Sequence, residues 1–107
     1  VRSDHEPFGL AGLWEQWQDP AGDQIFTYTI LTTASITSVQ HIHNRMPLIL
    51  NPEQEDYWLY GLRGTDSSEI GLFMKNLWSP PDLIYYPVSN RVNNPHNDDP
   101  LCIRPVE

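Results

Sequence analysis

The sequence has a single cysteine, Cys102, among its 107 residues, which excludes an internal disulfide framework and is typical of a reducing compartment. It also lacks any apolar run long enough to cross a bilayer as a helix. Residues 1–10 carry no apolar segment of the kind found in a secretory signal, and no glycine-rich phosphate-binding loop occurs. These absences leave one small domain, or part of a larger one.

Positive charge is scarce in this chain. Six Lys and Arg residues stand against fourteen Asp and Glu residues, which gives a formal net charge of −8. A total of this sign opposes a large nucleic-acid footprint, because phosphate binding rests on Lys and Arg. The acids are unevenly distributed, however, since residues 25–50 contain no Asp or Glu and include Arg45. A neutral-to-basic surface can therefore coexist with the acidic total.

The N-terminal half of the sequence predicts β-structure. The stretches FGLAGLWEQW (8–17) and QIFTYTILTT (24–33) are separated by the turn formers DPAGD, which is the pattern of a β-hairpin. SITSVQHI (35–42) is ambiguous, and Ser35 could cap one or two helical turns there. MPLILN (46–51) predicts a short buried strand.

Two helices are predicted in the middle of the chain. Asn51 has the character of an N-cap with Pro52 at the first helical position, and this helix is expected to run to about Leu62. A second helix is expected to open at Ser67, after a loop, and to stop at SPPD (79–82). The apolar positions expected on the buried faces are Trp58, Leu59 and Leu62 in the first helix and Ile70, Phe73, Met74 and Leu77 in the second.

The C-terminal part predicts two more strands around a loop. LIYYPVS (83–89) is expected to be an edge strand, NRVNNPHNDDP (90–100) an irregular polar loop, and LCIRPV (101–106) a last short strand. This order of elements predicts an α+β fold without βαβ alternation. Aromatic residues form 11% of the chain and include Trp14, Trp17, Trp58 and Trp78, and this content indicates a packed core and not a disordered chain.

The segment VQHIHNRMPLIL (39–50) has three interpretations. His41 and His43 would share a metal if they lay on a strand, but zinc needs three or four ligands, and His5, His96 and Cys102 show no ligand spacing. The segment could instead be an ordinary polar turn, in which a histidine caps carbonyl groups and an arginine pairs with a carboxylate. In the third interpretation His43 is a general acid/base and Arg45 an anion clamp. The residues alone leave these alternatives open.

Four blocks of the sequence carry a resemblance to a known family. GLAGLWEQW, TYTILTTA, IHNRMPLIL and YYPVSNRVNNPHNDDPLCIRPV occur in that order and cover nearly the whole chain. Together they resemble the C-terminal half of the SRAP family, the SOS-response-associated peptidase-like proteins. The resemblance implies an α+β fold with a curved, barrel-like sheet, two or three short helices and a positively charged groove for single-stranded DNA. It also implies that an N-terminal cysteine traps the open-chain aldehyde of an abasic site as a thiazolidine crosslink, at a centre that also removes the N-terminal Met.

The resemblance assigns roles to particular residues. His43 matches the active-site histidine and is expected to transfer protons. Arg45 matches the arginine of the same motif and is expected to contact DNA phosphate or the carboxylate of the site. Asn44 and Thr32 are expected to contact DNA or to line the pocket. Cys102 matches a different cysteine from the nucleophile and is expected to be a small buried residue. The family's N-terminal cysteine and its active-site Glu and Asn are absent, and His96 stands where the family has Arg.

These departures lead to an expectation about domain organisation. Residues 1–107 are expected to form the C-terminal portion of a single SRAP-like domain, starting inside a longer chain. The whole protein would act on single-stranded DNA with abasic sites, in the bacterial cytoplasm or a eukaryotic nucleus, without a cofactor, a metal or a membrane. Alone, the chain is expected to be inactive and to associate with its missing N-terminal half or with itself. The alternative is a truncated homologue that serves as a non-enzymatic binding module.

Overall fold

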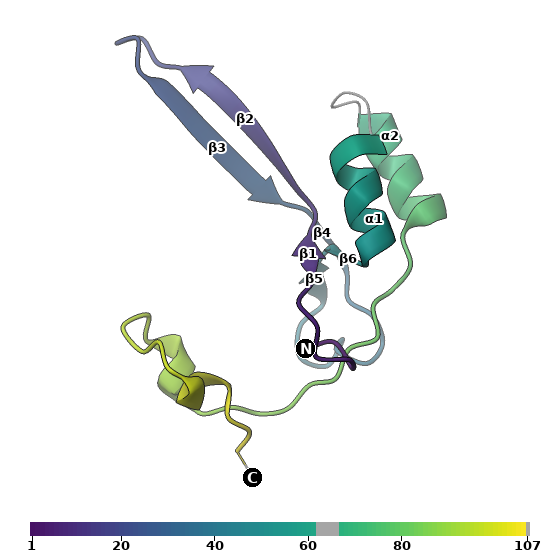
Figure 1. The fold of residues 1–107 in the computed structure, drawn as a ribbon, viewed down its shortest axis with the longest axis vertical. Coiled ribbons are helices and arrows are strands. Elements are labelled where there is room, and N and C mark those ends of the chain that lie inside the picture. Colours follow the sequence, from purple (N-terminus) through teal and green to yellow (C-terminus); the bar gives the residue numbers. More distant parts are fainter. Residues whose placement is uncertain (62–66, 107) are drawn as a thin grey trace.

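The computed structural model describes residues 1–61 and 67–106, which form an α+β fold, as predicted (Figure 1). The strands and the two α-helices, each with its π-helical continuation, are β1 (Gly9–Leu10), β2 (Gly12–Gln18), β3 (Gln24–Ile30), β4 (Thr32–Ala34), β5 (Arg45–Pro47), β6 (Ile49–Leu50), α1 (Pro52–Asp56) with η1 (Tyr57–Gly61), and α2 (Ser67–Leu72) with η2 (Phe73–Leu77). Two 3₁₀ turns follow, η3 (Asn90–Asn93) and η4 (Pro100–Ile103).

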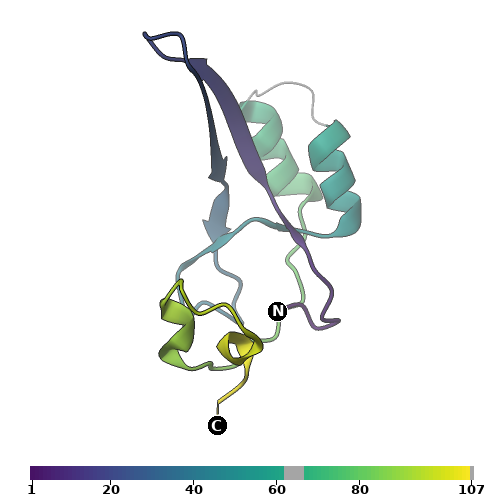
Figure 2. The same ribbon diagram turned by 60° about the vertical axis from the view of Figure 1, so that its left-hand side comes forward.

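The predicted hairpin is confirmed as the antiparallel pair β2–β3. Its register places Trp14 opposite Tyr28 and Gln16 opposite Phe26, and the chain reverses at Gly22, whose φ of 91° favours glycine. Asp19 supports the turn, because its backbone N–H and its side chain both bond to Asp23. The hairpin stands away from the helices as a free ribbon (Figures 1 and 2).

The six strands meet at one junction, where the chain passes from one strand pair to another. They pair as β1–β6, β2–β3 and β4–β5, so the described strands form three short ladders and not a closed barrel. The three residues between the strands close a ring of backbone hydrogen bonds. Ala11 N–H donates to Leu48 C=O, Leu48 N–H to Leu31 C=O, and Leu31 N–H to Ala11 C=O, over 2.8–2.9 Å. This ring fixes Leu48 in the middle of the 46–51 segment, which is buried as predicted apart from Pro47 and Asn51.

The helices cover this junction. Asn51 caps α1 through a reciprocal capping box with Gln54, which confirms the predicted helix start. Phe73 of the second helix packs with Ala11, Leu48 and Leu50 in the buried core. Partly buried Trp58 and Trp78 pack against this cluster, and their ring N–H groups donate to the carbonyls of Gly12 and Ile49.

Several large apolar side chains are exposed, and two of them, Leu59 and Leu77, were expected on the buried helix faces. Trp14 is 70% exposed and Trp17 is 53% exposed, because no described element covers either face of the hairpin. Leu59 and Leu77 are also exposed, so the buried stripes of the two helices are narrower than the periodicity predicted. The prediction for Leu62, and most of the loop expected before the second helix, lie outside the described residues.

The predicted strands at 83–89 and 101–106 are wrong. Only isolated bridges form there, between Arg2 and Leu83 and between Val88 and Pro105. The C-terminal segment bonds to itself instead, because Ser89 and Asp99 cap the two 3₁₀ turns with their side chains. Arg91 pairs with Asp99, and its hydrogen bond holds the pKa of that carboxyl below the ordinary value. Cys102 is buried in this segment, as expected.

Residues 35–42 form successive turns and no regular helix. Their backbone bonds run from Val39 N–H to Ile36 C=O and from Ile42 N–H to Val39 C=O. Ser35 does not cap them, because its buried hydroxyl has no hydrogen-bond partner among the described residues. A series of hydrogen-bonded turns, and not the expected helical turn, therefore connects β4 to β5.

The molecule is extended for its length. Its radius of gyration is 17.1 Å, whereas a compact domain of this size has about 13 Å. Figure 2 shows the hairpin and the C-terminal segment reaching out from the junction in different directions. Among the described residues, none of the helices combines the length and apolarity that a bilayer crossing requires.

Candidate active site

The candidate residues gather on the short ladder β4–β5. Thr32 opens β4, and Arg45 opens β5 directly after the turns that carry His43 and Asn44. The register places Ala34 opposite Arg45 and Thr32 opposite Pro47. The ladder begins at the bond from Ser35 N–H to Asn44 C=O. Buried Met46 and Leu48 then anchor this edge of the protein in the core.

His43 is held by the backbone of Arg45. Its Nδ1 lies 3.1 Å from the Arg45 backbone nitrogen and 3.0 Å from the Arg45 carbonyl oxygen. When Nδ1 lacks a proton it accepts from the N–H, and when it carries one it donates to the C=O. In either state Nδ1 is occupied, while Nε2 has no partner among the described residues. The exposed nitrogen Nε2 is therefore the one available for proton transfer.

The side chain of Arg45 is held by Thr32. Its Nη2 donates to both the Thr32 carbonyl oxygen and Thr32 Oγ1, each at 2.9 Å. The contact crosses the ladder diagonally, from the residue opposite Ala34 to the strand position two residues earlier. Arg45 thus connects the predicted site residues, because its backbone meets His43 and its guanidinium meets Thr32.

The guanidinium of Arg45 has no carboxylate partner within the described chain. The ion pairs found in residues 1–61 and 67–106 are Arg2–Asp4 and Arg91–Asp99. Both residues of the His43–Arg45 pair are exposed, and the surrounding sequence from 25 to 50 contains no acid. This exposed guanidinium is available to an anion. The polar-turn interpretation expected Arg45 to pair with a carboxylate, and within residues 1–61 and 67–106 it has no such partner.

His41 lies apart from this cluster. Its ring packs edge-on against Tyr85, with centroids 5.0 Å apart, whereas the ring of His43 bonds to Arg45. No group of three His, Cys, Asp or Glu side chains in the described part of the chain could hold a metal. Asn44 contributes its backbone carbonyl to the ladder, and its side chain is exposed.

The site is an open edge and not a cavity. A groove of about 460 Å³ lies between β1 and the first helix and is lined by residues such as Phe8, Leu10 and Trp58. None of the predicted site residues borders it. An open edge suits an extended ligand, which can lie along the surface past Nε2 of His43 and the guanidinium of Arg45.

Sequence reasoning missed how these residues are connected. The motif identified His43 and Arg45, but neither the double bond to Thr32 nor the two-way contact at Nδ1 follows from spacing. The β-hairpin-like return from β4 to β5 was the available signal, since antiparallel pairing places residues 32–34 beside residues 45–47.

Comparison with known proteins supplies the family. The family model described as "SOS response associated peptidase (SRAP)" matches residues 1–95. The chain is 38% identical over 99 residues to the abasic site processing protein YoqW of Bacillus subtilis (strain 168), covering 90% of this chain and 42% of YoqW. It is 32% identical over 100 residues to the abasic site processing protein HMCES of Rattus norvegicus, covering 92% of this chain and 27% of that protein. The HMCES of Gallus gallus is 34% identical over 102 residues, covering 92% of this chain and 29% of that protein.

The chain therefore spans less than half the length of these relatives. The family model covers most of the chain, and the chain belongs to the SRAP family.

Proposed function

We propose that the protein containing this chain processes abasic sites in single-stranded DNA, with His43 as its proton-transfer group and Arg45 as its phosphate clamp. The observation that carries the proposal is the geometry around Arg45. Arg45 orients a histidine through its backbone, and its guanidinium, which has no carboxylate partner among the described residues, is presented to an anion. The relatives named abasic site processing proteins support the substrate class.

Each part of this geometry suits a sugar–phosphate ligand. A phosphate beside Arg45 would be bound through charge-assisted hydrogen bonds, which are stronger than neutral ones. The neighbouring sugar would then lie within reach of His43, two residues away on the same edge. Thr32 and Asn44 flank the pair and complete the proposed site. The region's lack of acids removes a local source of repulsion toward DNA.

The proposed chemistry needs proton transfers that an imidazole can perform. The open-chain aldehyde of the abasic site condenses with the α-amine of an N-terminal cysteine, and a water molecule leaves to give a protonated imine, whose nitrogen keeps its hydrogen. The cysteine thiol then adds to the imine carbon and closes a thiazolidine ring. We assign His43 Nε2 to protonating the departing hydroxyl and to accepting the thiol proton. The cysteine belongs to a part of the protein outside these residues.

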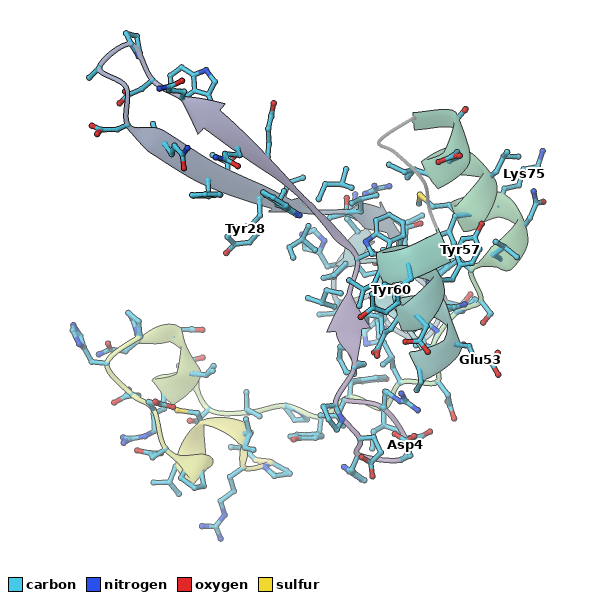
Figure 3. The ribbon with its side chains drawn as sticks, turned by 45° about the horizontal axis from the view of Figure 1, so that its top comes forward. Asp4, Tyr28, Glu53, Tyr57, Tyr60 and Lys75 are labelled. Carbon is cyan, nitrogen blue, oxygen red and sulfur yellow. The ribbon has the colours of Figure 1, made fainter. Side chains whose placement is uncertain are left out.

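We propose further that the chain is the C-terminal portion of one SRAP domain. The free hairpin supports this, because isolated two-stranded ribbons are marginal in water. Trp14, Phe26 and Tyr28 lie on one face of it and are 70%, 63% and 80% exposed. Figure 3 shows Tyr28 projecting from the hairpin on the side away from the helices. An uncovered aromatic face of this kind marks an interaction surface, and the remaining SRAP sequence is the partner that we propose for it.

The test uses the full-length protein, an oligonucleotide with one abasic site and a denaturing gel that separates the covalent product. His43→Ala is expected to slow crosslinking by about a hundredfold or more, the usual contribution of a positioned acid/base. Arg45→Ala is expected to weaken binding and to reduce the logarithmic salt slope by about 0.7, the value for one phosphate on a single strand.

The chain offers a matched control for each variant. His41→Ala removes an exposed histidine from the same turn, and Arg104→Ala removes an exposed arginine from the C-terminal segment. Both are expected to crosslink at the parent rate. Unchanged crosslinking in the His43 and Arg45 variants would refute the proposed roles, and equal losses in the two controls would show a loss of structure instead.

A further inference from the structure

We propose that Thr32 is a positioning residue, which acts on the ligand only through Arg45. The inference rests on the proposed function, because it assigns Arg45 to the phosphate. It changes the expectation for Thr32, which the family resemblance placed among residues that contact DNA or line the pocket. Two acceptors of Thr32, the carbonyl oxygen and Oγ1, bond to the same guanidinium nitrogen at 2.9 Å each.

The double contact fixes one end of a long exposed side chain. Arginine has five N–H donors, and the two on Nη2 are directed at Thr32. The three on Nε and Nη1 have no partner in residues 1–61 and 67–106 and remain for a ligand. A free arginine loses much rotamer freedom when it binds an anion, and a side chain held in advance loses less. Thr32 therefore strengthens phosphate binding without touching the phosphate.

The hydroxyl oxygen of Thr32 accepts one of these two hydrogen bonds. Its position on β4 is set by the ladder, with Thr32 opposite Pro47, so the hydroxyl and the carbonyl are presented to Arg45 together. Ala34, directly opposite Arg45, is small and leaves room for the arginine stem to lean toward Thr32. Because Thr32 is exposed and lies outside the core cluster, its substitution tests the contact with little effect on packing.

A double-mutant cycle in the full-length protein tests the proposal. Binding is measured by fluorescence anisotropy with a short labelled single strand that carries a tetrahydrofuran abasic analogue, which cannot crosslink. Thr32→Val keeps the shape and the carbonyl but removes the hydroxyl, and it is expected to weaken binding about two- to tenfold, the range of one hydrogen bond. Thr32→Ser restores the hydroxyl and is expected to bind as the parent does.

The decisive comparison is made in the Arg45→Ala background. A positioning residue has nothing left to position there, so Thr32→Val is expected to cause no further loss. A further loss of the same size would overturn the proposal, because Thr32 would then contact the DNA itself. An unchanged affinity of Thr32→Val beside a weakened Arg45→Ala would overturn it as well.

A second measurement separates this proposal from the proposed function. The guanidinium N–H signals of Arg45 are followed by NMR in the absence of DNA. Nη2 protons that are hydrogen-bonded to Thr32 are expected to exchange slowly with water. If Arg45→Ala leaves DNA affinity unchanged, the phosphate role of Arg45 fails, and these signals then decide the contact alone. Faster exchange in Thr32→Val but not in Thr32→Ser would support it, and equal exchange in all three proteins would overturn it.

Discussion

Gln54 connects the two helices, and its removal gives a prediction with a magnitude. The side chain is buried, with 7% exposure. Its Oε1 accepts from the backbone N–H of Asn51 at 3.0 Å, and its Nε2 donates to the Leu77 carbonyl at 3.1 Å and to Ser79 Oγ at 3.2 Å. It thus completes the cap of α1 and also satisfies a carbonyl near the end of η2.

Gln54→Ala removes three side-chain hydrogen bonds at once. Each is worth about 0.5–1.5 kcal/mol net, so the free energy of unfolding is expected to fall by roughly 2–4 kcal/mol. The assay is urea unfolding of the full-length protein followed by tryptophan fluorescence, because Trp58 and Trp78 pack against the same core. Gln40→Ala, exposed in the turns between β4 and β5, is the matched control and is expected to change stability by less than about 0.5 kcal/mol. Equal midpoints for the two variants would refute the reasoning.

Two further predictions use the glycines and the hairpin. Gly71→Ala is expected to raise the unfolding free energy by about 0.5–1 kcal/mol, because no atom lies within 4 Å of the added methyl in α2. Gly61→Ala is expected to lower the unfolding free energy by about 1–3 kcal/mol, since the methyl would lie 2.7 Å from the ring of Tyr57, which is stacked on Phe73. Thermal melts that rank these two glycine variants in the opposite order would contradict this reasoning. In the full-length protein, iodide is expected to quench Trp14 poorly, because the rest of the domain covers the hairpin. Quenching as strong as that of free tryptophan would show that the face is open.

Local signals in the sequence predicted most elements of the first 78 residues. The turn formers at 19–23 mark the hairpin, and Asn51 with Pro52 marks the first helix, because these signals depend on hydrogen bonds between near neighbours. The prediction of strands at 83–89 and 101–106 was wrong, because local signals do not specify a pairing partner. A strand needs a partner, and side-chain caps at Ser89 and Asp99 satisfy this segment locally instead.

The candidate site divides in the same way. The motif IHNRMP and its companion blocks named His43 and Arg45, and family membership was confirmed by comparison. Spacing could not say which nitrogen of His43 is occupied, because that depends on how the chain turns between residues 43 and 45. Nor could it separate the roles of the four tryptophans, since burial depends on which element lies opposite.

The sequence by itself determined the family, the hairpin, the helix starts and the two residues at the centre of the site. Only the tertiary structure decided that Arg45 joins His43 to Thr32, because β4 and β5 pair across a ten-residue connection in the chain. It also decided that the three ladders are tied at Ala11, Leu31 and Leu48. Backbone hydrogen bonds of this kind join residues distant in sequence, and no local pattern of residue types encodes their partners.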